Sequence, residues 1–288
     1  MRYYRIRPGT AHRLLAREGD TLYDLTSADD RLDSFGALAA EAVTMGAGLD
    51  DAATEVLDDA STLPLEALDD ASLPVVPGEV WAAGVTYKIS EEARAEESTM
   101  PEMYMDVYDA ERPEVFFKAT PERTVGPGDA VGIRADSEWD VPEPELGVVL
   151  HEGETVGYTL GNDMSSRDIE GQNPLYLPQA KVYDRCCSLG PSVASPATVG
   201  DPHDLEMAVR IERDGDTVFE DATSTGEMVR TCEELASYLL RHNVVPDLTV
   251  LLTGTALVPD DDFTLQEGDE VEIHIEDIGT LRNPVTRV

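Results

Sequence analysis

The chain has 288 residues, 41% hydrophobic and 6% aromatic, which is ordinary for a globular protein with a large core. Its charge is unusual, because 59 acidic residues against 21 basic ones give a formal net charge of −38. The acidic residues are spread along the whole chain and would repel nucleic acid and anionic membrane surfaces, so neither is an expected partner.

The residue usage also indicates a cytoplasmic protein. Lysine provides only three of the basic residues and arginine 18, which with the acidic excess is typical of a surface that stays soluble in a halophilic cytoplasm. The three cysteines, Cys186, Cys187 and Cys232, form neither a disulfide framework nor a metal-ligand spacing. We expect no signal peptide in MRYYRIRPGT and no membrane span of about 20 apolar residues.

The first 74 residues predict a small α+β domain. Alternating apolar residues predict short strands at 2–6, 12–17 and 20–25, and periodic apolar runs predict helices at 34–43 and 52–57. The proline-containing acidic stretch 63–77 is typical of a linker. Residues 1–74 contain no candidate chemistry, so we assign function to a larger domain at 75–288.

The larger domain is predicted to be β-rich, with an α+β fold that is mainly antiparallel. Its expected strands are 80–84, 114–118, 156–160, 249–253, 270–275 and 278–282, with a hairpin of 205–213 and 216–221 around Asp214-Gly215. The strongest helix signal is 226–242, whereas 171–191 is interrupted by prolines and predicted to be irregular.

The stretch DSEWDVPEPELGVVL holds two carboxylates with strand-like spacing. Side chains alternate along a strand, so Glu143 and Glu145 point to one face, roughly 7 Å apart along the backbone. The next strand leads to Asp163. Three carboxylates without nearby histidine or cysteine ligands favour a hard cation, magnesium or manganese, over zinc. Spacing alone is unspecific, because about one residue in five is acidic and most such pairs are simply solvated.

Four segments carry a resemblance to a known family: VYDAERPEVFFKATPERTVG, DSEWDVPEPELGVVL, GYTLGNDMSSRDIEGQNPLYLPQAKVYDRCCSLGP and LLTGTALVP. They resemble the fumarylacetoacetate hydrolase superfamily, and the third is similar to its archaeal branch of 2-keto-3-deoxy-pentonate dehydratases. The resemblance covers about Val80 to the C-terminus. It implies a mixed β fold of the fumarylacetoacetate hydrolase type, preceded by the small N-terminal α+β unit, with a magnesium site at Glu143, Glu145 and Asp163.

The resemblance also suggests how the other candidate residues act. Of the lysines at 88, 118 and 181, the last is the candidate proton-transfer group, because an amine can lose its proton and an arginine cannot. Glu114 is a second catalytic candidate, which would assist departure of a hydroxyl, as would the acidic residues Glu91 and Glu92 of a presumed lid. Substrate binding is expected from three further residues, Lys118, Arg167 and Thr255. For Arg167 the alternative is a structural ion pair with Asp168 or Glu170.

The implied reaction is dehydration of a small 2-keto acid, a 2-keto-3-deoxy-pentonate, to 2,5-dioxopentanoate. A bound cation would stabilise the enolate formed when a proton leaves carbon 3, after which the carbon-4 hydroxyl departs. Relatives suggest a homodimer or homotetramer.

Three alternatives remain at this stage: hydrolysis of an acylpyruvate, decarboxylation of oxaloacetate, and a binding module without activity. Hydrolases of the superfamily carry a histidine three residues after a tyrosine of the lid. Ser90 occupies that position after Tyr87, which argues against hydrolysis. A binding module is disfavoured because Glu143, Glu145, Asp163 and Lys181 are all present.

Overall fold

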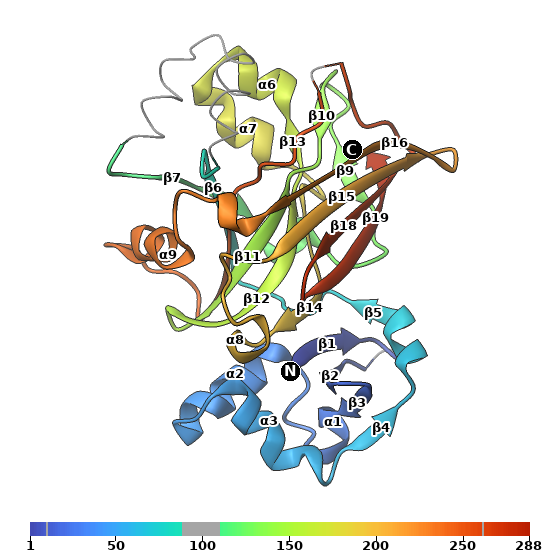
Figure 1. Ribbon diagram of the computed structural model, residues 1–288, viewed down its shortest axis with the longest axis vertical. Helices are drawn as coiled ribbons and strands as arrows, with labels where there is room; N and C mark the ends of the chain where they lie inside the picture. The colour runs from blue at the N-terminus through green and yellow to red at the C-terminus, as the bar shows by residue number, and fades with distance from the viewer. Residues whose placement is uncertain (10, 88–109, 261) are drawn as a thin grey trace.

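The computed structural model describes residues 1–9, 11–87, 110–260 and 262–288. Two sheets dominate it, with the N-terminal residues gathered at one end of the molecule (Figure 1). Most strand pairs are antiparallel, as predicted, and the fold is α+β and rich in strands. In this described part of the chain, no helix is long and apolar enough to cross a membrane.

The N-terminal residues form the predicted short strands and helices, and also α1 (Leu25–Ala28) and β4 (Ser61–Leu63), which were not predicted. The predicted elements are β1 (Arg2–Ile6), β2 (Arg13–Glu18), β3 (Thr21–Asp24), α2 (Phe35–Met45) and α3 (Leu49–Leu57). The side chain of Ser34 accepts a hydrogen bond from the Ala37 amide and starts α2, and Gly46 ends it in the left-handed conformation.

The predicted linker at 63–77 is more structured than expected. It contains a 3₁₀ helix (Leu65–Asp70) and strand β5 (Ala71–Ser72), which pairs with β1. Leu63, Ala67 and Leu68 pack against a small apolar cluster that includes Tyr4 and Leu15. Burial of these side chains explains why a stretch with turn-like composition is ordered.

The larger sheet combines N-terminal strands with strands of the larger part of the chain. Its order is β4-β3-β2-β1-β14-β12-β11-β17-β6-β7, with β5 and β8 attached at its side. The strands not yet defined are β6 (Glu79–Gly84), β7 (Glu114–Ala119), β8 (Thr124–Val125), β11 (Pro144–His151), β12 (Glu154–Asp163), β14 (Cys187–Ala194) and β17 (Leu248–Leu252). Because β1 pairs with β14, the N-terminal strands continue the sheet of the larger part.

A five-stranded sheet packs against the larger one. It comprises β9 (Val131–Ile133), β15 (Glu206–Arg213), β16 (Asp216–Ser224), β18 (Glu270–Ile275) and β19 (Gly279–Arg287), in the order β16-β15-β18-β19-β9. Val148 of the first sheet and Val209 and Ile273 of the second belong to one hydrophobic core, which also includes Phe35 of α2. The division into domains at 1–74 and 75–288 therefore stays a prediction.

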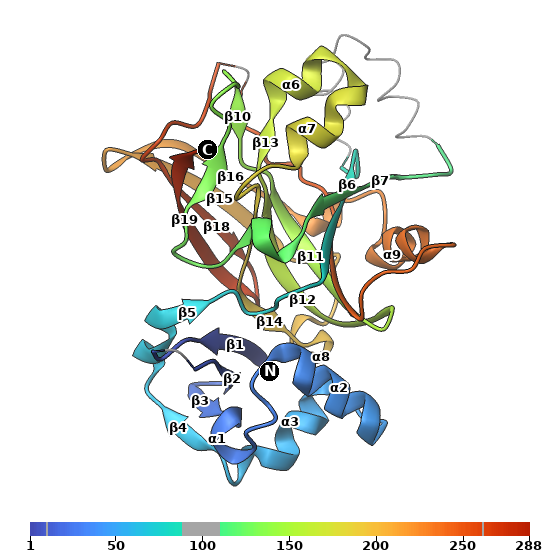
Figure 2. The same cartoon turned by 180° about the vertical axis from the view of Figure 1, so that it is seen from behind.

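The segment 171–191, predicted to be irregular, is largely ordered. It contains the end of α6 (Arg167–Gln172), a 3₁₀ turn (Pro174–Tyr176), α7 (Leu177–Lys181) and the start of β14. Pro174 and Pro178 lie in the first turns of their helices, where a missing amide hydrogen costs nothing. The prolines thus begin short helices here instead of breaking a longer one. Figure 2 shows α6 and α7 beside the ends of β6 and β7.

The predicted helix at 226–242 is shorter than expected. Helix α9 spans Cys232–Leu240, preceded by a 3₁₀ turn (Thr225–Glu227), and a four-residue helix, α8 (Pro196–Val199), lies earlier in the chain. Thr231 caps α9 by accepting a hydrogen bond from the Glu234 amide, which sets its start. Cys232, Leu235 and Leu239 form the buried face, as predicted, but Met228 lies outside the helix.

Candidate metal centre and active site

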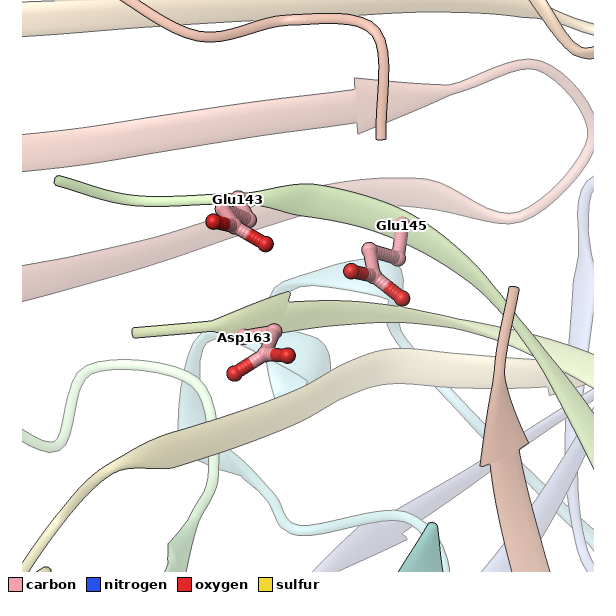
Figure 3. Close-up of side chains that lie close together, drawn as sticks. All are labelled: Glu143, Glu145 and Asp163. Carbon is pink, nitrogen blue, oxygen red and sulfur yellow. The ribbon is translucent and has the colours of Figure 1, made fainter. Parts of the chain in front are cut away.

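Three buried carboxylates meet where two neighbouring strands of the large sheet lie side by side. Glu143 immediately precedes β11, Glu145 lies within β11, and Asp163 ends β12. The Asp163 amide donates to the Glu143 carbonyl at 2.9 Å, which fixes the two backbones together. One ligand atom from each residue lies within 4.8 Å of the others. Figure 3 shows both glutamates on one side of their strand, facing Asp163.

The local sequence explains this placement. Pro144 is the first residue of β11, a position at which a strand tolerates a residue without an amide hydrogen. The Glu143 amide donates to the side-chain oxygen of Asn162 at 3.1 Å, across the pair that Pro144 and Asn162 form in the ladder. Alternation along the strand then turns Glu145 to the same face as Glu143, as the spacing predicts.

Of the three carboxylates, Glu145 has the fewest ion-pair and hydrogen-bond partners among the described residues. One of its oxygens accepts from the Gly254 amide at 2.7 Å, and the other is buried without a hydrogen-bond partner among the described residues. Burial, followed by repulsion from Asp163 and Glu143, raises the pKa of Glu145 well above its ordinary value. A divalent cation between the three groups would relieve both effects, so these residues fit a hard metal ion.

Lys118, from β7, supports the centre from within the fold and is fully buried. Its ammonium donates to the carbonyls of Met164 at 2.8 Å and Lys181 at 2.5 Å, and it forms an ion pair with Asp163. Burial acts to lower the pKa of Lys118, but Asp163 and the weaker effect of Cys186 raise it, and the net direction is upward. Three donors with three protein partners favour a role in holding Asp163 and α7. Direct substrate binding by Lys118 stays a prediction.

Lys181 ends α7 and reaches the same carboxylates from the other side. Its amine donates to Glu143 Oε2 at 2.8 Å and to the Ser165 hydroxyl at 2.6 Å, and it lies 3.5 Å from Asp163 Oδ2. The side chain is buried, and Phe116 places its ring 5.7 Å from the amine. The structure thus brings the predicted proton-transfer residue into direct contact with two of the three predicted metal ligands.

Arg167 begins α6 and is also buried. Its guanidinium lies 3.0 Å from Glu143 Oε1 and forms an ion pair with this predicted metal ligand. This is a third role for Arg167, besides substrate binding and an ion pair with Asp168 or Glu170. Lys118, Lys181 and Arg167 thus form ion pairs with two of the three carboxylates, Glu143 and Asp163. Such pairing is the condition under which charges can be buried at all.

The remaining two candidates lie at the start of β7 and just after the end of β17. Glu114 begins β7, and its carboxylate lies so close to Gly84 of β6 that a side chain at that glycine would meet it at 1.9 Å. Thr255 follows Gly254, and its buried hydroxyl accepts from the Leu257 amide at 3.0 Å. Catalysis by Glu114 and substrate binding by Thr255 and Arg167 stay predictions, and Lys88, Ser90, Glu91 and Glu92 lie outside the described residues.

Sequence reasoning did not single out Ser165, which contacts Lys181 directly. The signal was present, because Ser165 follows Asp163 by two residues and a strand-like backbone returns it to the same face. It formed part of the recognised segment but was assigned no role.

A substitution at Gly254 would test whether its amide holds Glu145 in place at the metal centre. Its φ of +88° is left-handed, and a Cβ there would lie 2.1 Å from the Thr86 hydroxyl. We expect Gly254→Ala to lower the free energy of unfolding by about 1–3 kcal/mol from backbone strain, with a further loss from the clash, and to weaken metal binding through Glu145. Chemical denaturation and calorimetry with magnesium would measure both effects.

A matched control for this substitution is Gly268→Ala. Gly268 has a similar φ of +94° but open space around the added Cβ, so it carries the strain without the clash. Equal losses of stability and equal magnesium affinity in the two variants would contradict a role for Gly254 in holding Glu145.

Comparison with known proteins places the chain in a family. Residues 79–286 match the model of the fumarylacetoacetate (FAA) hydrolase C-terminal domain. The chain therefore belongs to the fumarylacetoacetate hydrolase family, as the resemblance implied.

The similar proteins include several dehydratases, besides oxaloacetate tautomerases and a hydrolase. A protein of Haloferax volcanii named as a probable 2-keto-3-deoxyxylonate dehydratase is 62% identical over 289 residues, covering 100% of both chains. The 2-dehydro-3-deoxy-D-arabinonate dehydratase of Saccharolobus solfataricus is 47% identical over 219 residues, covering 74% of each. A solved structure of 2-keto-3-deoxy-D-arabinonate dehydratase with magnesium and 2,5-dioxopentanoate has a TM-score of 0.86 and 37% identity, covering 100% of this chain and 99% of that one.

Proposed function

We propose that this protein is a magnesium-dependent hydro-lyase that converts 2-keto-3-deoxy-pentonate to 2,5-dioxopentanoate in oxidative pentose degradation. The observation that carries the proposal is the contact of Lys181 with both Glu143 and Asp163, a lysine amine set among three buried carboxylates. Full-length similarity to a named dehydratase supports the same reaction. The xylonate and arabinonate names of the relatives describe one substrate, because the two sugar acids differ at carbons that lose their stereochemistry.

Glu143, Glu145 and Asp163 would hold the metal ion, and manganese would also suit three oxygen ligands. When bound, the ion supplies Lewis acidity toward a 2-keto acid and stabilises negative charge on its keto oxygen. Within the described part of the chain, one buried oxygen of Glu145 has no hydrogen-bond partner and would suit a cation as ligand. The Gly254 amide keeps that carboxylate in place through its other oxygen.

The protein residues would carry the proton transfers. Lys181 would accept the proton from carbon 3 in its neutral form, and the hydroxyl on carbon 4 would leave with a proton as water. Carbon 5 of the C3=C4 product then loses a proton while carbon 3 gains one, which gives a C4=C5 enol. This enol loses its hydroxyl proton and gains a proton at carbon 4, so that carbon 5 becomes the aldehyde of 2,5-dioxopentanoate. Glu114 is the candidate for assisting departure of the hydroxyl, while Arg167 and Thr255 are the candidates for binding the substrate carboxylate.

The location, assembly and salt tolerance that we propose for the protein follow from its composition and its relatives. We infer a cytoplasmic protein that acts on a small 2-keto acid as a homodimer or homotetramer. Its acidic composition supports activity at high salt, since a net charge of −38 favours a strongly solvated surface.

The test of the proposed function is a comparison of three substrates with purified protein and magnesium. We expect formation of 2,5-dioxopentanoate from 2-keto-3-deoxy-pentonate, little cleavage of an acylpyruvate, and little loss of carbon dioxide from oxaloacetate. Chelation of magnesium should abolish the dehydration, and its readdition should restore it. Faster turnover of the acylpyruvate or of oxaloacetate would assign the site to that reaction instead.

A further inference from the structure

Ser165 lies at the centre of the contacts around Lys181. It belongs to the two-residue strand β13 (Ser165–Ser166), which pairs with β10 (Asp140–Val141), and β10 ends two residues before Glu143. Its side chain is completely buried. The strand pair fixes the Ser165 backbone on the same segment that delivers the first carboxylate, so the position of its hydroxyl is tied to the metal centre.

The hydrogen bonds of Ser165 define the direction of its hydroxyl. It donates its single proton to the carbonyl of Asp163 at 3.0 Å, and it accepts from the Lys181 amine at 2.6 Å. Because the proton is committed to the carbonyl, an oxygen lone pair faces the amine. Ser165 is therefore built to receive a hydrogen bond from Lys181.

Ser165 differs from the other partners of this amine. Glu143 and Asp163 are the predicted metal ligands, and a bound cation would compete with Lys181 for their charge. Ser165 carries no charge and lies outside the carboxylate cluster. Its contact with Lys181 would therefore persist in the metal-loaded enzyme.

The main chain of Lys181 is held as well, since its carbonyl accepts from the Lys118 amine at 2.5 Å. A lysine side chain has four flexible carbons, so a fixed main chain alone does not place its amine. The Ser165 hydroxyl fixes the far end. Accurate placement of a proton-transfer group matters, because an error of about 1 Å can reduce the rate by about a hundredfold.

We propose that Ser165 is a positioning residue, which holds the Lys181 amine at the place where it meets the substrate. This inference rests on the proposed function, in which Lys181 transfers the carbon-3 proton. Ser165 acts through Lys181 and is assigned no contact with the substrate.

The test uses the full-length protein with magnesium and 2-keto-3-deoxy-pentonate, and compares Ser165→Ala, Ser165→Thr and Ser192→Ala. Ser165→Ala should lower kcat about ten- to hundredfold while KM changes less than about twofold. Ser165→Thr keeps the oxygen and should recover most of the lost kcat. Ser192 is also buried and donates to a backbone carbonyl, that of Ile278, so Ser192→Ala controls for the loss of a buried hydroxyl and should retain kcat.

Thermal unfolding and calorimetry with magnesium alone confirm that each variant is folded and binds the metal. If Ser165→Thr is unstable because of its added methyl group, the change in kcat at constant KM in Ser165→Ala decides the question. Unchanged kcat in Ser165→Ala, or an equal loss in Ser192→Ala, would overturn the inference. A wild-type protein without dehydratase activity would instead refute the proposed function.

Discussion

Replacing Lys181 by arginine should lower turnover at least about a hundredfold, which is the usual range for the loss of a general base. Arginine keeps the positive charge but does not supply a neutral nitrogen near pH 7. The position of Lys181 supports this expectation, because its amine lies within 3.5 Å of two carboxylates that would hold the metal ion. Steady-state kinetics with 2-keto-3-deoxy-pentonate would measure the loss.

The control is a comparison with binding and with proton exchange. If Lys181 removes the carbon-3 proton, affinity for an inert 2-keto acid such as pyruvate should change little in Lys181→Arg. Exchange of carbon-3 protons with heavy water should be lost together with dehydration. Lys181→Met, which removes the amine at similar length, should show the same pattern. Undiminished exchange in Lys181→Arg would move the role of base to Glu114 or Lys118.

The second large effect concerns the three carboxylates. Glu143→Gln, Glu145→Gln and Asp163→Asn should each weaken magnesium binding at least about 100-fold, because even partners outside the ligand set typically contribute 10–100-fold. Dehydration at low magnesium concentration should disappear with it. Isothermal calorimetry with magnesium, followed by assays over a range of magnesium concentrations, would measure both losses.

Glu145→Gln should stabilise the protein when no metal is bound. The pKa of Glu145 is raised on folding, so the folded state retains a proton that the unfolded state has lost. Stability from this group is present below its unfolded pKa of about 4.3 and falls as the pH rises toward the folded pKa. With chelator present, the thermal midpoint of Glu145→Gln should exceed that of the wild type at pH 8, with a smaller difference near pH 5.

Asp140→Asn provides the matched control for these variants. Asp140 is also a buried carboxylate, three residues before Glu143, and burial raises its pKa to about 6. It lies outside the cluster of candidate ligands. Asp140→Asn should therefore retain magnesium affinity. Wild-type affinity in all three cluster variants, or an equal loss in Asp140→Asn, would place the metal elsewhere.

Local patterns predicted much of the candidate site. The two-residue spacing of Glu143 and Glu145 sufficed to place both on one face, because alternation along a strand depends only on the backbone. The scarcity of lysine in an arginine-rich chain similarly drew attention to Lys118 and Lys181, and both are buried beside Asp163. The family match then agreed with the resemblance found in the recognised segments.

Tertiary structure decided what these residues contact. The partners of Lys118 are Asp163 and two backbone carbonyls, which come from segments 46 and 63 residues away. No local pattern encodes such contacts, because they depend on how strands far apart in the sequence pair. The same reason explains the ion pair of Arg167 with Glu143, since the alternative to substrate binding had named only the sequence neighbours Asp168 and Glu170.

By itself, the sequence determined the fold class, the strand that carries the two glutamates and the choice of oxygen ligands, because backbone alternation and side-chain chemistry are local properties. Only the tertiary structure decided that Ser165 meets the Lys181 amine and that the Gly254 amide holds Glu145. These contacts join β13 to α7 and the end of β17 to β11. They exist because burial of a common core brings those elements together, and partners of this kind stabilise polar groups inside that core.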